Sequence, residues 1–406
     1  KWSDGEPFTA EDFRYFWEDM AKDPDLGKES MPSEMLVEGE EPKFEIIDPL
    51  TVRYTWSKPN PAFLQALAWP APHYIYRPAH YMKQFHGKYT DAAKLQAMVK
   101  EANVDDWPSL HTRMQRQRRP ENPDLPTLQA WRNTTQSPSE RFIFERNPYF
   151  HRVDSEGNQL PYIDRIVMDV VSTEVIPAKT GGGESDLQAR YIRFDNFTFL
   201  KEAEEKHGFH TYLWSTGKGA QVALFPNLNV QDSVWRGLMR DVRFRRALSL
   251  AIDRWGGSAN LAKISLIKGV SGTFRPGAPW SLPMPELEKV PGYWRDIEKS
   301  RAEARRLLKE AGVPNLKLRF LNRQVAQPFQ PAGIYAVDQW RRVGIKAEHV
   351  ELETKLYFDA LHKGEFDVAV NNISDFADDP SAQFNTLLSK KTSAISYAGA
   401  TRNPMS

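Results

Sequence analysis

Three aspartates near the carboxyl end of the sequence, Asp375, Asp378 and Asp379, offer its clearest chemistry. They come just after FDVAVNN (366–372), an apolar run of the length expected for a buried strand. Two carboxylates that flank a sugar bond can hydrolyse it by acid and base catalysis. A carboxylate can equally anchor an ammonium group or sugar hydroxyls, or simply lie in solvent. The residue types therefore leave a catalytic pair, a ligand anchor and a solvated cluster open.

Other common reactive groups are missing from the sequence. It has no cysteine, which excludes thiol catalysis, thiolate zinc sites and disulfides. His73, His80 and His86 are six or seven residues apart and match none of the short helical spacings that bring two imidazoles onto one metal ion. No serine lies in a Gly-x-Ser-x-Gly turn. We therefore expect neither a metal nor a cofactor.

The charge balance argues against a polyanionic partner. The 406 residues include 54 Lys and Arg against 53 Asp and Glu, so the chain has no strong overall field. The basic segment RMQRQRR (113–119) has no aromatic residues between its arginines, which favours a solvated loop over a nucleic-acid adaptor. The 12 Trp, 14 Tyr and 22 Phe exceed what one core needs, and Trp69 is a candidate platform for a ligand, beside the alternative of core packing.

The last hundred residues predict the frame that holds the aspartates. Strands at 316–322, 345–352 and 366–372 alternate with helices at 329–343 and 354–363. This alternation is typical of βαβ units and a parallel sheet. In the first helix we expect Ile334, Val337 and Trp340 to share one face, and in the second Gly364 to end the helix. Ligands of such sheets bind beyond the carboxyl ends of the strands, which here carry Asn371, Asn372, Ser374 and Asp375.

The rest of the chain predicts a mixed α/β body. A hairpin is expected at 44–56, and residues 105–140 are polar and rich in proline, as in a loop or linker. Further strands are expected at 141–146, 165–171 and 221–227, and further helices at 10–20, 63–68, 199–206 and 241–254.

The order of several motifs resembles one family. DGEPFTAEDFRYFWEDM (4–20), RFIFERNPYF (141–150), DVRFRRALSLAIDR (241–254) and GEFDVAV (364–370) are similar, in the same order, to motifs of the peptide-type (family 5) extracellular solute-binding proteins of bacterial ABC importers. NPYFHRVDSEGNQLPYIDRI (147–166) resembles a branch that imports peptides and oligosaccharides.

The resemblance implies an α/β, two-lobed fold like that of the type II periplasmic binding proteins, with an extra subdomain. We expect residues 1–133 to form this subdomain, 134–228 the remainder of lobe one and 229–406 lobe two. Family members have further segments beyond both ends, so the resemblance implies a truncated chain with incomplete lobes.

The resemblance also implies a ligand site. Asp375 matches the aspartate that pairs with the amino terminus of a bound peptide, and Asn371, Asn372 and Phe376 would line the same face. Peptide binders commonly have tryptophan at the position of Asn372, so oligosaccharides stay beside peptides as ligands. Two more asparagines, Asn227 and Asn229, lie at the predicted crossover between lobes, where they contact ligand or hold the hinge.

The expected function is capture of an oligopeptide or oligosaccharide by a monomer without catalysis, and its delivery to an ABC membrane permease. Nucleic acid is not an expected partner. The expected location is the periplasm or the outer face of the cell membrane, although Lys1–Gly5 carries no signal sequence. The alternative is a carbohydrate-active hydrolase that uses Asp375, Asp378 and Asp379.

Overall fold

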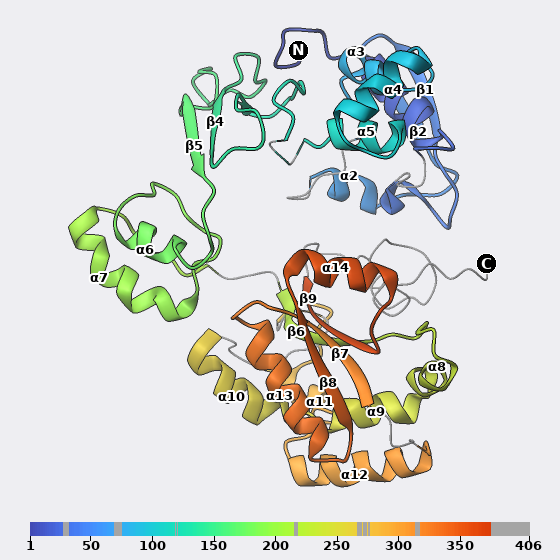
Figure 1. Cartoon of the computed structure of the whole chain (residues 1–406), viewed down its shortest axis with the longest axis vertical. Coiled ribbons are helices and arrows are strands. Elements are labelled where there is room, and N and C mark those ends of the chain that lie inside the picture. The colour runs from blue at the N-terminus through green and yellow to red at the C-terminus, as the bar shows by residue number, and fades with distance from the viewer. Residues whose placement is uncertain are drawn as a thin grey trace. The chain divides into compact units, whose positions relative to one another are not determined.

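The chain forms two compact units, Lys1–Val175 (unit 1) and Ile176–Ser406 (unit 2) (Figure 1). The computed structural model describes residues 1–26, 32–68, 75–117, 119, 121–214, 218–265, 270, 274, 277–312 and 317–374. The boundaries expected at residues 133 and 228 remain predictions.

Unit 1 begins with the predicted helix and hairpin. Helix α1 (Ala10–Arg14) is capped by Thr9 and continues as the π-helix η1 (Tyr15–Ala21), which buries its aromatic residues in the core. Strands β1 (Lys43–Asp48) and β2 (Thr51–Thr55) pair antiparallel beside them. The aromatic side chains of this segment are therefore largely used for packing.

Four short helices and a small sheet complete unit 1. The helices are α2 (Ala62–Leu67), α3 (Ala79–Met82), α4 (Ala92–Glu101) and α5 (Trp107–Met114). Residues 107–114 were expected in a loop; that expectation is wrong because Asp106 caps a helix there, with its carboxylate accepting from the Ser109 amide. The antiparallel sheet has the order β3 (Trp131–Asn133), β4 (Arg141–Arg146), β5 (Arg165–Asp169).

Unit 2 is built on the predicted parallel sheet. After α6 (Ile176–Gly181) and α7 (Phe197–His207), its four strands have the order β6-β9-β7-β8. Strands β7 (Lys317–Arg323), β8 (Lys346–Leu352) and β9 (Val368–Ser374) run parallel, while β6 (Lys218–Pro226) joins β9 antiparallel. The predicted βαβ arrangement is confirmed.

Helices cover both faces of this sheet (Figure 1). Leu318 and Phe320 of β7 face the core formed with α9 (Val242–Leu250), α12 (Ile297–Glu310) and α13 (Phe329–Arg341). Leu321, which alternates with them, faces α14 (Thr354–Lys363) on the other side. The remaining helices are α8 (Ser233–Arg240), α10 (Arg254–Ser265) and α11 (Met284–Leu287).

Two details differ from the sequence prediction. The single helix expected at 241–254 is interrupted at residues 251–253, between α9 and α10. Ile334 is 60% exposed, because α13 packs through Ala332, Ala336 and Trp340 instead. The predicted end of α14 is confirmed, since Gly364 has a left-handed conformation with φ 74°.

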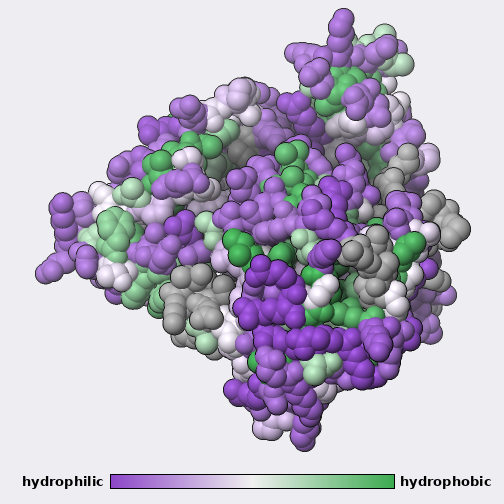
Figure 2. Space-filling model, turned by 60° about the horizontal axis from the view of Figure 1, so that its bottom comes forward, coloured by the Kyte–Doolittle hydropathy of each residue, from purple (hydrophilic) through white to green (hydrophobic). Residues whose placement is uncertain are grey.

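Hydrophilic residues predominate on the molecular face drawn in Figure 2, where hydrophobic ones gather in separate patches. Within the described part of the chain, no helix has both the length and the apolar character needed to cross a membrane.

Candidate functional site

The carboxyl ends of β7, β8 and β9 meet at one edge of the sheet in unit 2. Phe320 lies opposite Val368 and Leu321 opposite Ala369, so two residues further on Arg323 reaches the level of Asn371. The antiparallel β6 begins at this same edge, where Lys218 pairs with Ser374. The edge therefore gathers polar residues from three strands, as expected for a ligand site in an open α/β sheet.

Asn371 joins β9 to the cationic end of β7. Its side chain is buried, and its Oδ1 accepts hydrogen bonds from the Arg323 guanidinium and, at 2.9 Å, from the backbone N–H of Asn372. Asn372 itself is half-buried. Because Asn371 is buried and bonded in this way, it orients Arg323 and the end of β9.

Aromatic rings surround the same guanidinium. The Arg323 Cζ atom lies 3.7 Å from the ring centre of Phe329, 5.2 Å from that of Tyr357 and 5.5 Å from that of Phe358. These distances are within the range of cation–π attraction. The Tyr357 hydroxyl in turn donates to the Val370 carbonyl at 2.8 Å. Packing against these rings therefore holds the guanidinium in place, whereas an arginine surrounded by water would be flexible.

A second polar pair, Asn322 and His349, lies between the sheet and α13. The buried Asn322 donates from Nδ2 to the Phe329 carbonyl at 2.8 Å and lies 2.9 Å from His349 Nε2. Burial lowers the pKa of His349, which keeps the ring neutral and able to accept this bond. α13 comes this close because residue 333 is glycine: a Cβ there would lie within 3 Å of both side chains.

The two remaining described candidates lie at the opposite end of the sheet. Asn227 follows Pro226, which pairs with Val368 at the start of β9. Ser374 is six residues further along β9, about 20 Å away at the usual rise per residue. The buried Asn227 side chain donates to the carbonyls of Gly364 and Phe366 at 3.2 and 3.0 Å. Its Oδ1 accepts from the backbone N–H of Asn229 at 3.0 Å.

The structure therefore does not bring Asn227 and Asn229 together with Asn371 and Asn372. Of the two roles considered for the first pair, these contacts favour the structural one. The Asn229 side chain accepts from Arg240 at 3.0 Å, which joins the end of β6 to α8.

The other candidates, Asp375, Phe376 and Trp69, lie outside the described residues, as do Asp378 and Asp379. Among the residues that are described, no group of three or more His, Asp or Glu side chains is placed to hold a metal ion. Of the three histidines considered as ligands, His73 lies outside the described residues, His86 is buried and hydrogen-bonds to the Asp19 carbonyl, and His80 lies beside Asp4.

Arg323 was not among the site residues predicted from the sequence. The predicted strand ended one residue earlier, at Asn322, and the residue after it was not considered. The available signal was a charged residue at the carboxyl end of a buried strand, the position from which open α/β sheets reach their ligands.

A mixed sheet with helices on both faces, and a polar edge at the carboxyl ends of its parallel strands, is the architecture of the open α/β folds, whose ligands bind at that edge. The same fold occurs in the periplasmic binding protein MelB of Agrobacterium fabrum, solved in complex with stachyose. The TM-score is 0.65 at 20% identity, over 92% of this chain and 56% of that one. This confirms the predicted type II periplasmic-binding-protein fold.

The chain belongs to family 5 of the bacterial extracellular solute-binding proteins, whose model matches residues 1–394. Two curated relatives are a periplasmic alpha-galactoside-binding protein of Rhizobium meliloti and the periplasmic oligopeptide-binding protein OppA of Escherichia coli. The first is 26% identical over 63% of this chain and 35% of its own length, and the second 25% identical over 97% and 65%. The chain thus spans about one third to two thirds of these relatives.

Proposed function

We propose that this protein is the substrate-binding component of an ABC importer, which captures an oligopeptide or an oligosaccharide without catalysis and delivers it to a membrane permease. Its family consists of extracellular solute-binding proteins. The observation that carries the proposal is the polar edge of unit 2, where Arg323 and Asn371 join the ends of two parallel strands. We place the protein in the periplasm or at the outer face of the cell membrane, as a monomer.

The proposed ligand contacts are Asn372, Asp375 and Phe376. Asn372 lies near the end of β9, and the other two follow this strand in the sequence. Arg323 and Asn371 hold this end in place. Amide, carboxylate and guanidinium groups can bond to sugar hydroxyls and to peptide groups alike. Both ligand classes also occur among the relatives, one of which is named for alpha-galactosides and another for oligopeptides. Nothing in these relatives supports the hydrolase alternative.

The test is a binding screen with the full-length protein against raffinose-type oligosaccharides and peptides of two to nine residues. Thermal shift finds the ligand, because a ligand that binds only the native state raises the unfolding temperature, and calorimetry then gives its affinity. We expect Asp375→Asn to weaken binding of that ligand at least about tenfold, since a charge-assisted bond to a ligand contributes more than about 1.4 kcal/mol.

The matched control is Asp359→Asn. Asp359 is an exposed carboxylate of α14 whose described ion pair is with Lys355, four residues before it. This change should leave ligand affinity within about twofold of the unchanged protein. If neither ligand class raised the unfolding temperature, the proposed function would be wrong. If ligand bound equally to the Asp375 variant, the function would stand and the anchor would be wrong.

A further inference from the structure

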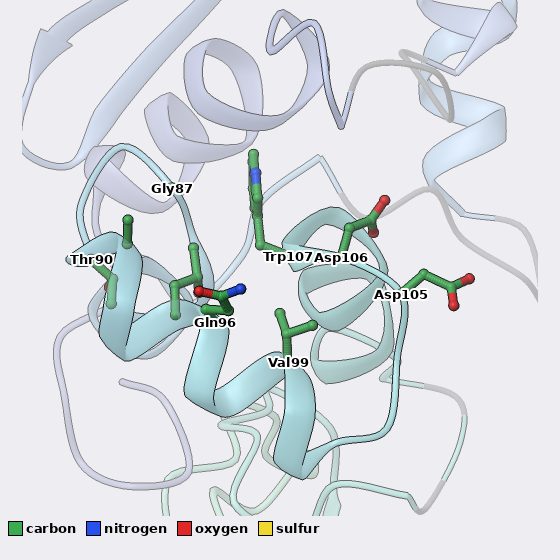
Figure 3. Close-up of a pocket in the computed structure, with 9 residues that line it drawn as sticks. Gly87, Thr90, Gln96, Val99, Asp105, Asp106 and Trp107 are labelled. Atoms are coloured by element: carbon green, nitrogen blue, oxygen red, sulfur yellow. The ribbon is translucent and has the colours of Figure 1, made fainter.

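A groove of about 440 Å³ lies in unit 1, between α4 and the start of α5 (Figure 3). Helix α4 contributes Leu95, Gln96 and Val99, and the residues that begin α5 contribute Asp105, Asp106 and Trp107. We call this site the α4–α5 groove. Its volume falls within the range of small-molecule sites. No residue of the polar edge in unit 2 takes part in it, so it is independent of the proposed function.

Part of the floor of the groove is aliphatic. Leu95 and Val99 are one helical turn apart on the same side of α4, with Leu95 buried and Val99 half-buried. In Figure 3 the Val99 side chain points from α4 into the space below Trp107. A floor of this kind favours a methylene chain over a polar surface, because apolar contact area leaves water.

The wall of the groove is an aromatic ring held from behind. The Trp107 ring centre is 4.8 Å from that of the buried His86, and the indole packs against the backbone at Gly87. A Cβ at position 87 would lie 3.3 Å from the indole Cε2 atom, so glycine is what allows this approach. The ring is therefore fixed by its neighbours while it still lines the groove, and the π-face of an indole attracts cations.

One end of the groove is acidic. Asp105 is exposed and makes no hydrogen bond or ion pair with the residues that the structure describes. Asp106 caps α5 through the backbone N–H of Ser109 at 2.8 Å, which fixes its carboxylate at the start of that helix. Figure 3 shows both carboxylates on the side away from Thr90. Lys88, which follows Gly87, is already paired with Asp19 at 2.6 Å.

We propose that the α4–α5 groove binds an aliphatic chain that ends in a guanidinium or ammonium group. The chain lies on Leu95 and Val99, and the cationic head lies between the Trp107 indole and the carboxylates of Asp105 and Asp106. This chemistry is shared by free alkylguanidines or alkylamines and by an arginine or lysine side chain of another polypeptide. The combination of floor, wall and charge selects a long organic cation over a metal ion or a neutral lipid.

The test observes Trp107 directly in the full chain labelled with 5-fluorotryptophan. Its ¹⁹F resonance is identified by its absence from the spectrum of Trp107→Phe. We expect agmatine to shift this resonance saturably, and a rise in sodium chloride from 20 to 500 mM to weaken the binding severalfold. Hexanol, which has a similar chain and no charge, should shift it at least about tenfold less at equal concentration.

A calorimetric titration with agmatine needs no assignment and compares two surface variants. Asp105→Asn should weaken binding about fivefold to tenfold, whereas Asp124→Asn should leave it unchanged. Asp124 is an exposed carboxylate of unit 1 that does not line the groove. Asp105 is also exposed, so both variants are expected to fold.

The peptide acetyl-Gly-Arg-Gly-amide separates the two sources of the cation. Binding of agmatine alone supports a free small molecule, and binding of the peptide, with or without agmatine, supports a side chain of a partner. The proposal is overturned if neither probe binds, if hexanol binds as well as agmatine, or if Asp105→Asn binds agmatine as tightly as the unchanged chain.

Discussion

The change Asn227→Ala separates a structural asparagine from a ligand contact. The Asn227 side chain makes three hydrogen bonds, with the Gly364 and Phe366 carbonyls and the Asn229 amide. At about 1 kcal/mol for each, their loss costs about 3 kcal/mol of the free energy of unfolding, and the two carbonyls lose a buried donor. A domain has about 5–15 kcal/mol in total, so unit 2 should survive in a weakened form.

Differential scanning calorimetry of the full chain measures this loss. For a unit of about 200 residues, about 3 kcal/mol corresponds to a fall of about 6–12 °C in the midpoint of the unit 2 transition. Asn229→Ala is the matched control. Asn229 is half-buried, and its side chain hydrogen-bonds to Arg240 alone within the part of the chain that the structure describes. It should cost less than about 1 kcal/mol.

One outcome would make Asn227 a ligand contact and not a structural residue. If Asn227→Ala unfolded at the temperature of the unchanged protein and yet bound the transported ligand much more weakly, Asn227 would contact the ligand. The hydrogen bonds to residues 364 and 366 would then contribute nothing of importance.

Two further predictions concern acid stability and the polar edge. Burial lowers the pKa of His111 from 6.5 to about 3, so the native state resists its protonation and unit 1 should lose up to about 1.4 kcal/mol per pH unit as the pH falls from 6.5 towards 3. In urea titrations, His111→Phe should lower the free energy of unfolding at pH 7, because the Tyr15 hydroxyl loses its partner at 2.8 Å. Between pH 6.5 and 4.5, however, the free energy of unfolding of this variant should fall by about 2–3 kcal/mol less than that of the unchanged protein. An equal fall in both proteins would contradict the role given to His111. Gly333→Ala should push α13 away from His349, cost about 1–3 kcal/mol and weaken ligand binding in calorimetry. Gly237→Ala in α8, where an added Cβ meets nothing within 4 Å, should instead stabilise the protein slightly, and similar behaviour of the two variants would refute the packing argument.

The sheet of unit 2 could be predicted because its signals are local. β9 begins with an apolar run, β7 and β8 mix apolar with charged residues over the length of a strand, each crossover helix has its own periodicity, and Gly364 ends α14 within the same stretch of chain. Because these local signals give the direction of β9, Asn371 and Asn372 could be placed at the carboxyl edge of the sheet, where the structure has them; that ligand binds at this edge stays a prediction. In α13, by contrast, Ile334 was assigned to the buried face, because the spacing of apolar residues does not show that small residues such as Ala332 and Ala336 make the contact.

The contacts within the site could not be predicted, because they depend on strand register and order. Arg323 meets Asn371 only because β7 and β9 are neighbours with a particular alignment. Asn227 is separated from that edge only because β6 runs antiparallel to β9. A single sequence gives neither the neighbour of a strand nor, for β6, its direction, so residues from both ends of the sheet were candidates for one site, with a hinge role as the alternative for Asn227 and Asn229.

The position of β6 has a consequence for how the protein is made. In the order β6-β9-β7-β8, the strand that is synthesised first has the last-synthesised strand as its neighbour. The bond from Asn227 to Phe366 closes a loop of 139 residues. During translation β6 therefore emerges from the ribosome long before its partner, with apolar residues such as Phe225 still uncovered. Such long-range pairing is slow, so unit 2 should complete its sheet only after β9 has left the ribosome, and a chaperone that holds the early strand would be most useful in that interval.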